Sequence, residues 1–366
     1  MAKAKKIRGL DCSAPAADGV KLVFLTRFNE MLEWRNTALD WSNPEGVHSM
    51  RVASRRLRSA MRDFLPYVPK RSFASVVKQL KGLAATLGEV RDQDVAIQAL
   101  EDIENRAPNE HSPALKQLIE KRKKLRDQQR KKLKAVLAKS ELKKLEVDFA
   151  AAVEAATATS ERKNKRTTPP AFAEVSRGII RDRLKEFEKR SDGLFKPLDI
   201  EALHDLRIAT KRLRYGIELL APCFDRSISA HAKRAARLQT TLGHLHDCDS
   251  WIVSIGKQIA PARKERATEQ LAAFAWLLNH FTKLRTKHLH HASSRWREWE
   301  THEVSDKLRA AITVEKPVAQ QSEEQVGESQ DQILSEPQAE VAAELQDQVA
   351  GEATDQVAGE QMRQAL

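Results

Sequence analysis

Basic residues at helical spacing occur twice in this 366-residue chain and are its clearest chemical signal. Residues 45–66 read EGVHSMRVASRRLRSAMRDFLP, and residues 201–222 read EALHDLRIATKRLRYGIELLAP. Both segments contain a histidine, a row of arginines or lysines, a leucine and a closing proline, and each of these recurs after 156 positions. A repeat at this spacing indicates two copies of one helical unit, and the feature that the copies share is positive charge.

The spacing places these cations on one face of each predicted helix. At 100° per residue they fall within a sector of about 80°, and apolar residues gather on the opposite side. We call the two rows the first and second stripes: His48, Arg51, Arg55, Arg58 and Arg62; and His204, Arg207, Lys211 and Arg214. Like charges one turn apart repel each other by a few tenths of a kcal/mol per pair. Two matching stripes therefore predict an anionic ligand that offsets the repulsion.

A linear phosphate polymer fits the stripes better than a nucleic acid does. Arginine binds phosphate oxygens in bidentate fashion, and a chain of closely spaced charges matches one cation per helical turn. Proteins that bind single-stranded nucleic acid also present aromatic side chains to the bases, whereas aromatic residues make up only 5% of this chain. Sequence-independent binding of a nucleic-acid backbone remains the alternative, because both polymers share the same charge pattern.

The sequence gives less support to catalysis or to a metal site. His48 and His204 are of the type that acts as general acid or phosphate acceptor, but no glycine-rich phosphate loop or carboxylate pair stands beside either. We therefore expect a binding protein, not an enzyme, with no cofactor. Two histidine clusters have metal-ligand residue types, and we interpret both as structural: His244, His246, Asp247 and Asp249; and His288, His290 and His291.

The elements that position the stripes are predicted to be helices throughout. Asn43 and Pro44 read as the N-cap and first residue of the first stripe helix, Asp199 as the cap of the second, and Pro66 and Pro222 as their ends. The remaining helices are expected over 18–40, 71–87, 92–106, 112–157, 171–190, 226–242, 245–260 and 265–300.

A second repeated block follows each stripe. Leu87, Gly88 and Asp92 recur as Leu242, Gly243 and Asp247, 155 positions later. We expect each glycine to end a helix, and each aspartate to begin the next one and to orient stripe arginines. If the helix before each glycine packs beside the stripe, we expect its cations to widen the stripe into a groove; the alternative is a solvated face. These cations are Lys78, Lys81, Lys233, Arg234 and Arg237.

Composition bounds the rest. Only 13 glycines and 13 prolines occur, which favours an all-α fold. Three cysteines, Cys12, Cys223 and Cys248, make no disulfide framework and fit a reducing compartment. No apolar run is long enough to span a membrane and no secretory signal is evident, so we expect a cytoplasmic protein. The formal net charge is +12, but 315–366 contains 12 acids and two bases, which leaves about +22 for the rest.

The predicted organisation is two similar halves. A basic N-terminal extension covers 1–17, a first helical bundle 18–158, a linker 159–170, a second bundle 171–302, and an acidic, disordered tail 303–366. Four to five helices in each half predict two antiparallel four-helix bundles related by an approximate twofold axis.

The motif H-x-x-R-[VI]-x-x-[RK]-R-L-R, followed about 30 residues later by L-G-x-x-x-D and then duplicated, resembles the CHAD domain, the conserved histidine α-helical domain. The resemblance covers roughly residues 20–300. It implies two four-helix bundles with basic helices lining a central groove or pore, and it implies binding of inorganic polyphosphate, with association with polyphosphate granules. Matched by position, the implied ligands are the members of both stripes from His48 to Arg58 and from His204 to Arg214, with weaker matches at Lys78, Lys81, Lys233 and Arg237. The second half departs from this pattern at His246, which stands where Arg91 stands in the first.

Overall fold

Helices make up the regular structure of the chain. The computed structural model describes residues 4–163 and 169–313, and within that range the one β contact is an isolated bridge between Pro15 and Ala171. The all-α fold class is confirmed. The helices of the first half are α1 (Ala16–Glu33), α2 (Arg35–Ala38), α3 (Glu45–Phe64), α4 (Ala74–Glu104), α5 (Ser112–Val136) and α6 (Lys139–Lys163). Those of the second half are α7 (Phe172–Arg190), α8 (Ile200–Leu220), α9 (Ile228–Lys264), α10 (Thr268–Thr301) and α11 (Val304–Thr313).

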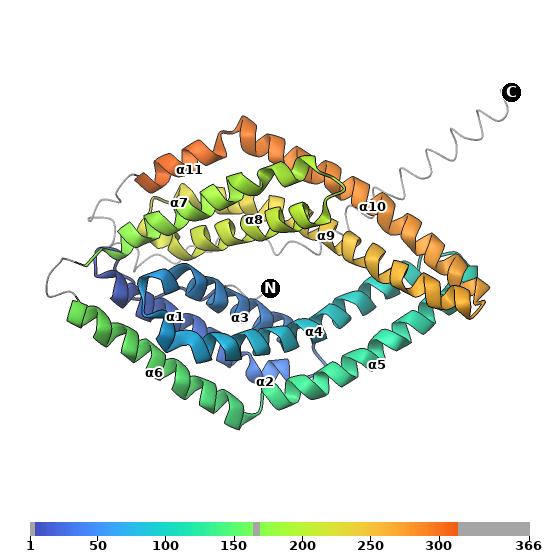
Figure 1. The fold of residues 1–366 in the computed structure, drawn as a ribbon, viewed down its shortest axis with the longest axis horizontal. Helices are drawn as coiled ribbons and strands as arrows, with labels where there is room; N and C mark the ends of the chain where they lie inside the picture. Colours follow the sequence, from blue (N-terminus) through green and yellow to red (C-terminus); the bar gives the residue numbers. More distant parts are fainter. Residues whose placement is uncertain (1–3, 164–168, 314–366) are drawn as a thin grey trace. The chain divides into compact units, whose positions relative to one another are not determined.

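Both stripe segments form the predicted helices. Helices α3 and α8 pack against each other in the middle of the fold (Figure 1). The Asp199 side chain accepts a hydrogen bond from the Ala202 amide at 2.9 Å, as expected of an N-cap. Asn43 accepts one from the Glu45 amide at 2.9 Å, and α3 begins at Glu45, one residue later than predicted. Pro66 and Pro222 lie in short 3₁₀ turns directly after α3 and α8, so both predicted ends are confirmed.

The prediction that Gly88 and Gly243 end their helices is wrong. Helices α4 and α9 continue through them, and positive φ at glycine occurs, among the described residues, at Gly9. An interior glycine costs about 1 kcal/mol relative to alanine. Burial of the neighbouring Leu87 and Leu242 offsets that cost, because each leucine is packed in the core. As a result, Asp92 and Asp247 lie in mid-helix and not at a helix N-terminus.

Three other helix boundaries differ from prediction. The segment 18–40 divides into α1 and α2, and the segment 112–157 divides into α5 and α6 around Leu137, which is buried. The tail predicted from residue 303 begins with an ordered helix, α11, whose Val304, Leu308 and Ile312 are buried. The rest of that tail lies outside the described residues, as do residues 164–168 of the predicted linker. The domain boundaries therefore stay predictions.

The two halves share their core. The Phe64 ring on α3 stacks on Phe172 on α7 at 5.5 Å, and a Cβ on Gly19 of α1 would overlap the same Phe172 ring. A second cluster joins the far ends of α4 and α5 to those of α9 and α10 through Leu100, Leu115, Ile255 and Leu277, among others. The halves therefore meet in two places, with the paired helices α3 and α8 between them (Figure 1). No described helix combines the length and hydropathy needed to cross a bilayer.

A disulfide between Cys12 and Cys223 contradicts the expectation that the cysteines are unpaired. It links the segment before α1 to the turn after α8, across 211 residues. The same segment is held by backbone hydrogen bonds from Phe172 to Ala14 and from Ala173 to Cys12, at 2.9 and 2.8 Å. Spacing alone does not show that residues so far apart are neighbours. The disulfide also removes the argument that cysteine usage fits a reducing compartment.

Reduction of this disulfide is expected to lower the free energy of unfolding by about 2–5 kcal/mol, because a long closed loop restrains the unfolded chain. Urea unfolding with and without a dithiol reductant measures the effect. The variant Cys12→Ser/Cys223→Ser is the control and should unfold at the same urea concentration in both conditions. A wild-type midpoint that reductant does not move would contradict the stabilising role.

Candidate functional site

The two stripes share one cavity. It has a volume of about 210 Å³ and lies between α3, α4 and α8. Its lining residues are Arg51, Arg55, Arg58, Ser59, Arg62, Ala84, Lys211, Arg212 and Tyr215. Six of these nine are cationic and none is acidic. The structure therefore concentrates positive charge from both copies in one place.

Burial of the opposite faces of α3 and α8 turns the stripes toward this cavity. Met50, Leu57 and Phe64 of α3 are fully buried, as are Leu206, Leu213 and Ile217 of α8. Each fully buried side chain of this size contributes about 1.5–3 kcal/mol. The summed contribution exceeds the repulsion of a few tenths of a kcal/mol for each pair of like charges along a stripe.

The stripe cations meet across the helix pair at Tyr215. The Arg55 guanidinium of α3 lies over the Tyr215 ring of α8, 5.4 Å from its centroid, and Arg214 lies 5.7 Å from the same centroid. A ring face attracts a cation, and Arg55 is mostly withdrawn from water here. Tyr215 therefore fixes the position of two arginines without neutralising their charge.

Burial and neighbouring cations lower the pKa of two groups in or beside the cavity. Burial, together with Arg207, Arg55 and Arg62, lowers the pKa of Lys211 to about 7. Burial and the nearby Arg91 lower the pKa of His48 to about 4. Both shifts disfavour the positively charged form of the side chain, as burial beside other cations does.

The repeated aspartates lie beside the stripes, as expected. Asp92 Oδ1 is 3.7 Å from Arg51 Nη2, an ion pair too long for a direct hydrogen bond. The charge of Asp247 acts on Arg207 in the equivalent place in the second half. These aspartates therefore act on the stripe arginines through their charge. They do so from the middle of a helix and not from a helix N-terminus, as was predicted.

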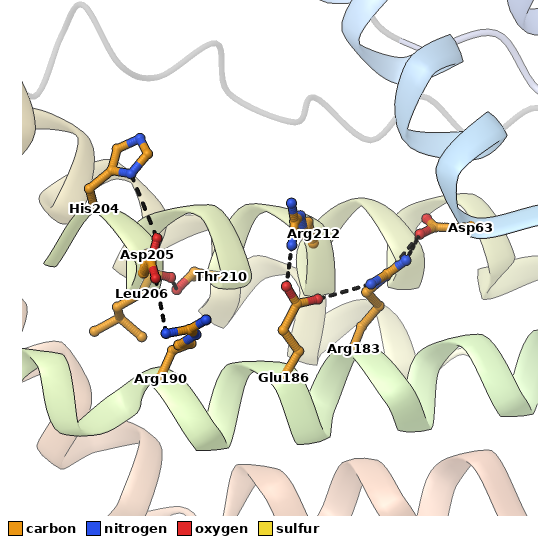
Figure 2. Close-up of polar contacts among 9 residues, drawn as sticks. All are labelled: Asp63, Arg183, Glu186, Arg190, His204, Asp205, Leu206, Thr210 and Arg212. Atoms are coloured by element: carbon orange, nitrogen blue, oxygen red, sulfur yellow. Dashed lines mark hydrogen bonds and ion pairs between the residues drawn. The ribbon is translucent and has the colours of Figure 1, made fainter. Parts of the chain in front are cut away.

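Behind the stripes lies an ion triad that occurs once in each half. Glu30 of α1 accepts hydrogen bonds from Arg27 at 2.6 Å and from Arg56 at 2.8 Å. In the second half, Glu186 of α7 accepts from Arg183 at 2.9 Å and from Arg212 (Figure 2). All three members recur at the same spacing of 156 residues as the stripes. That spacing is the sequence signal from which the triad could have been predicted.

The second triad also connects the halves. Arg183 donates to Asp63 Oδ1 of α3 at 2.6 Å, and Asp63 is 3% exposed (Figure 2). Burial raises the pKa of Asp63 and Arg183 opposes that shift. Loss of one partner from such a buried pair costs about 3–5 kcal/mol. This ion pair therefore holds α3 against α7 beside the cavity.

The histidines do not line the cavity. The rings of His204 and His246 lie 5.1 Å apart, and those of His244 and His288 lie 4.9 Å apart. His246 thus stands beside His204 much as Arg91 stands beside His48, whose charge it opposes. Within the described ranges, no three His, Cys, Asp or Glu side chains are placed to hold a metal ion.

The structure brings together part of the predicted ligand set. Arg51, Arg55, Arg58, Arg62 and Lys211 line the cavity, whereas Arg207 and Arg214 stand next to it. The predicted residues Lys78, Lys81, Lys233 and Arg237 are exposed on α4 and α9 and do not line it. Ser59, Ala84, Arg212 and Tyr215 were not predicted. Of these four, only Arg212 could have been found from the sequence, because it is the repeat of Arg56.

Comparison with known proteins identifies the family of the chain. Residues 23–256 match the family model of the CHAD domain. A crystal structure of the CHAD domain from the plant Ricinus communis has a TM-score of 0.56 and 21% identity, covering 85% of this chain and 96% of that one. PptA from Streptomyces chartreusis has a TM-score of 0.58 and 13% identity, covering 78% and 100%. At these identities the two structures show a shared fold. No curated protein sequence matches the chain.

Lys211 is expected to titrate with a midpoint near pH 7 in the absence of an anion. Its pKa is lower in the folded than in the unfolded chain, so the unfolded chain binds more protons between pH 7 and about 10.5. Lys211 should therefore make the free energy of unfolding rise with pH in that window. Amine reactivity of Lys211, followed by mass spectrometry from pH 5 to 10, measures the midpoint, with exposed Lys124 as the internal reference. A Lys211 midpoint equal to that of Lys124 would contradict the electrostatics described.

Proposed function

Because the chain belongs to the CHAD domain family, whose members are associated with polyphosphate binding in general, we propose that it binds inorganic polyphosphate between α3 and α8. The observation that carries the proposal is the cavity lined by Arg51, Arg55, Arg58, Arg62, Lys211 and Arg212 with no acidic side chain among its lining. Each of these cations would otherwise repel the others in a partly desolvated space.

Unpaired polar atoms beside the cavity support an anionic ligand. Among the described residues, His48 Nδ1 and the Nε atoms of Arg55, Arg207 and Arg212 are buried without a hydrogen-bond partner. A buried donor without a partner costs about 1–3 kcal/mol. Phosphate oxygens accept several hydrogen bonds each, so a bound chain recovers this cost and neutralises the stripes together.

The length of the stripes fits a polymer. The cavity-lining residues of α3 extend from Arg51 to Arg62, which is about 16 Å along a helix. Beyond the cavity lining, the rows of cations continue toward the beginnings of α3 and α8, through Arg207, to His48 and His204. We propose that a chain of phosphate units follows this path, each unit held by cations from both copies.

Nucleic acid fits this surface less well. Tyr215 is the single aromatic residue lining the cavity, and it is 8% exposed and covered by Arg55 and Arg214. Stacking of a base requires an accessible aromatic face. We therefore propose that the site selects a phosphate backbone without bases.

We propose binding and not catalysis. No carboxylate lines the cavity, and His48 and His204 stand outside it. The low pKa of His48, about 4, leaves it mostly unprotonated at neutral pH and makes it a poor general acid there. A cytoplasmic location, expected from the sequence, and association with polyphosphate granules, implied by the family resemblance, form part of the proposal.

Replacement of one cation from each stripe, Arg51→Ala/Arg207→Ala, is expected to weaken binding of a long polyphosphate by about tenfold or more. Each lost charge-assisted hydrogen bond is worth about 1.5–3 kcal/mol. Titration calorimetry at two salt concentrations measures affinity, which should fall steeply with salt in the wild type and less steeply in the variant.

The matched control is Lys121→Ala/Lys124→Ala, which removes the same charge from the exposed surface of α5. It should change affinity far less than the stripe variant. Equal losses in the two variants would show that the stripes are not the site. Displacement of polyphosphate from the wild type by an equal charge concentration of single-stranded DNA would instead favour the nucleic-acid function.

A further inference from the structure

Two of the differences between the copies change the charge and the side-chain size beside the cavity. Arg62 at the end of the first stripe corresponds, 156 residues later, to Glu218, and Ser59 corresponds to Tyr215. Arg62, Ser59 and Tyr215 all line the cavity, whereas Glu218 does not. Although the sequence is repeated, the two copies therefore contribute different side chains to the cavity.

An acidic residue compensates the last cation of the second stripe, but no described residue pairs with the last cations of the first stripe. Arg214 Nε donates to Glu218 Oε1 at 2.6 Å, which compensates the last cation of the second stripe. Within the described part of the chain, Arg58 and Arg62 form no ion pair, and both face the cavity. The end of the first stripe thus holds the least compensated positive charge of the two.

A buried hydroxyl faces the same place. Ser59 lines the cavity and is 4% exposed, and its Oγ has no hydrogen-bond partner among the described residues. A tyrosine at this position, as in the second copy, would bring a large ring into the space. The small serine leaves room for a ligand and also supplies a donor to it.

Ion pairs between the two halves hold the residues next to Arg62 in place. Asp63, the next residue, is the partner of Arg183 on α7. Arg212, which also lines the cavity, is held through Glu186 to the same Arg183. These ion pairs brace the backbone around Ser59 and Arg62, and they hold the Arg212 guanidinium in place before a ligand arrives.

We propose that this cavity binds the terminal phosphate of a linear phosphate chain, while the stretch toward His48 and His204 binds interior units. The inference rests on the proposed function and refines its ligand. A terminal phosphate has three non-bridging oxygens and a second ionisation near neutral pH, by analogy with phosphate monoesters. It therefore carries more charge and accepts more hydrogen bonds than an interior unit, which matches the uncompensated Arg58 and Arg62 and the free Ser59 hydroxyl.

The test compares two ligands of matched total charge, linear tetraphosphate and cyclic hexaphosphate, at a pH where both are fully ionised. The linear chain has ends and the ring has none. We expect the wild type to bind the linear ligand about tenfold or more tightly than the ring, roughly the worth of one charge-assisted hydrogen bond. Equal affinity for the two would overturn end recognition.

Two variants test whether the preference for the linear ligand arises in this cavity. Arg62→Glu gives the first copy the acid of the second, and Ser59→Ala removes the hydroxyl with little change in volume. Both should lose the preference for the linear ligand, whereas the matched charge reversal Lys124→Glu on exposed α5 should keep it. Circular dichroism checks that each variant is folded, and Ser59→Ala decides the question if Arg62→Glu is not. Preference retained in folded Ser59→Ala and Arg62→Glu would place the end elsewhere.

The inference and the proposed function fail in different ways. A wild type that binds long polyphosphate but does not distinguish the tetraphosphate from the ring retains the function and loses the end pocket. A wild type that binds neither long polyphosphate nor the tetraphosphate loses both.

Discussion

Repulsion among closely placed cations is the constraint on which the rest of this structure depends. Helices α3 and α8 are packed together with their basic stripes toward a shared cavity, where burial and the neighbouring arginines lower the pKa of Lys211 to about 7. The fully buried Leu57 and Leu213 and their neighbours on the opposite faces hold the helices in place. Apolar burial thus supplies the free energy that keeps like charges close, and a polyanion would relieve the strain that remains.

Ion triads determine which arginines face the cavity and which are bonded inside the fold. Glu30 and Glu186 each hold two arginines behind a stripe, so the arginines of the stripe segments divide into two groups. Arg56 is bonded inside the fold, whereas Arg55 beside it faces the cavity. In the second half, Arg212 does both, because it pairs with Glu186 and also lines the cavity. The second triad extends through Asp63 to α3, so one set of charges both connects the halves and braces the site.

Departures from symmetry give the site its particular character. The duplicated pattern implies equivalent ligands in both halves, yet Arg214 is compensated by Glu218 while Arg62 has no such partner in the described structure. Tyr215 replaces a serine and positions Arg55 and Arg214 across the helix pair. The repeated sequence thus lines one asymmetric cavity, because Ser59, Arg62 and Tyr215, which differ from their counterparts, all face it.

The sequence by itself determined the helical fold, the two stripes, their N-cap at Asp199 and their ends at Pro66 and Pro222, because helical periodicity and capping are local properties. It also indicated five of the cavity residues. Tertiary structure alone decided that α4 and α9 continue through Gly88 and Gly243, since burial of neighbouring leucines outweighs a local preference. It also decided the pairing of Cys12 with Cys223. Tertiary structure likewise placed Ser59 and Tyr215 in the cavity lining and left Lys78 and Lys233 outside it. These features depend on which residues distant in sequence become neighbours, and spacing along one chain does not contain that information.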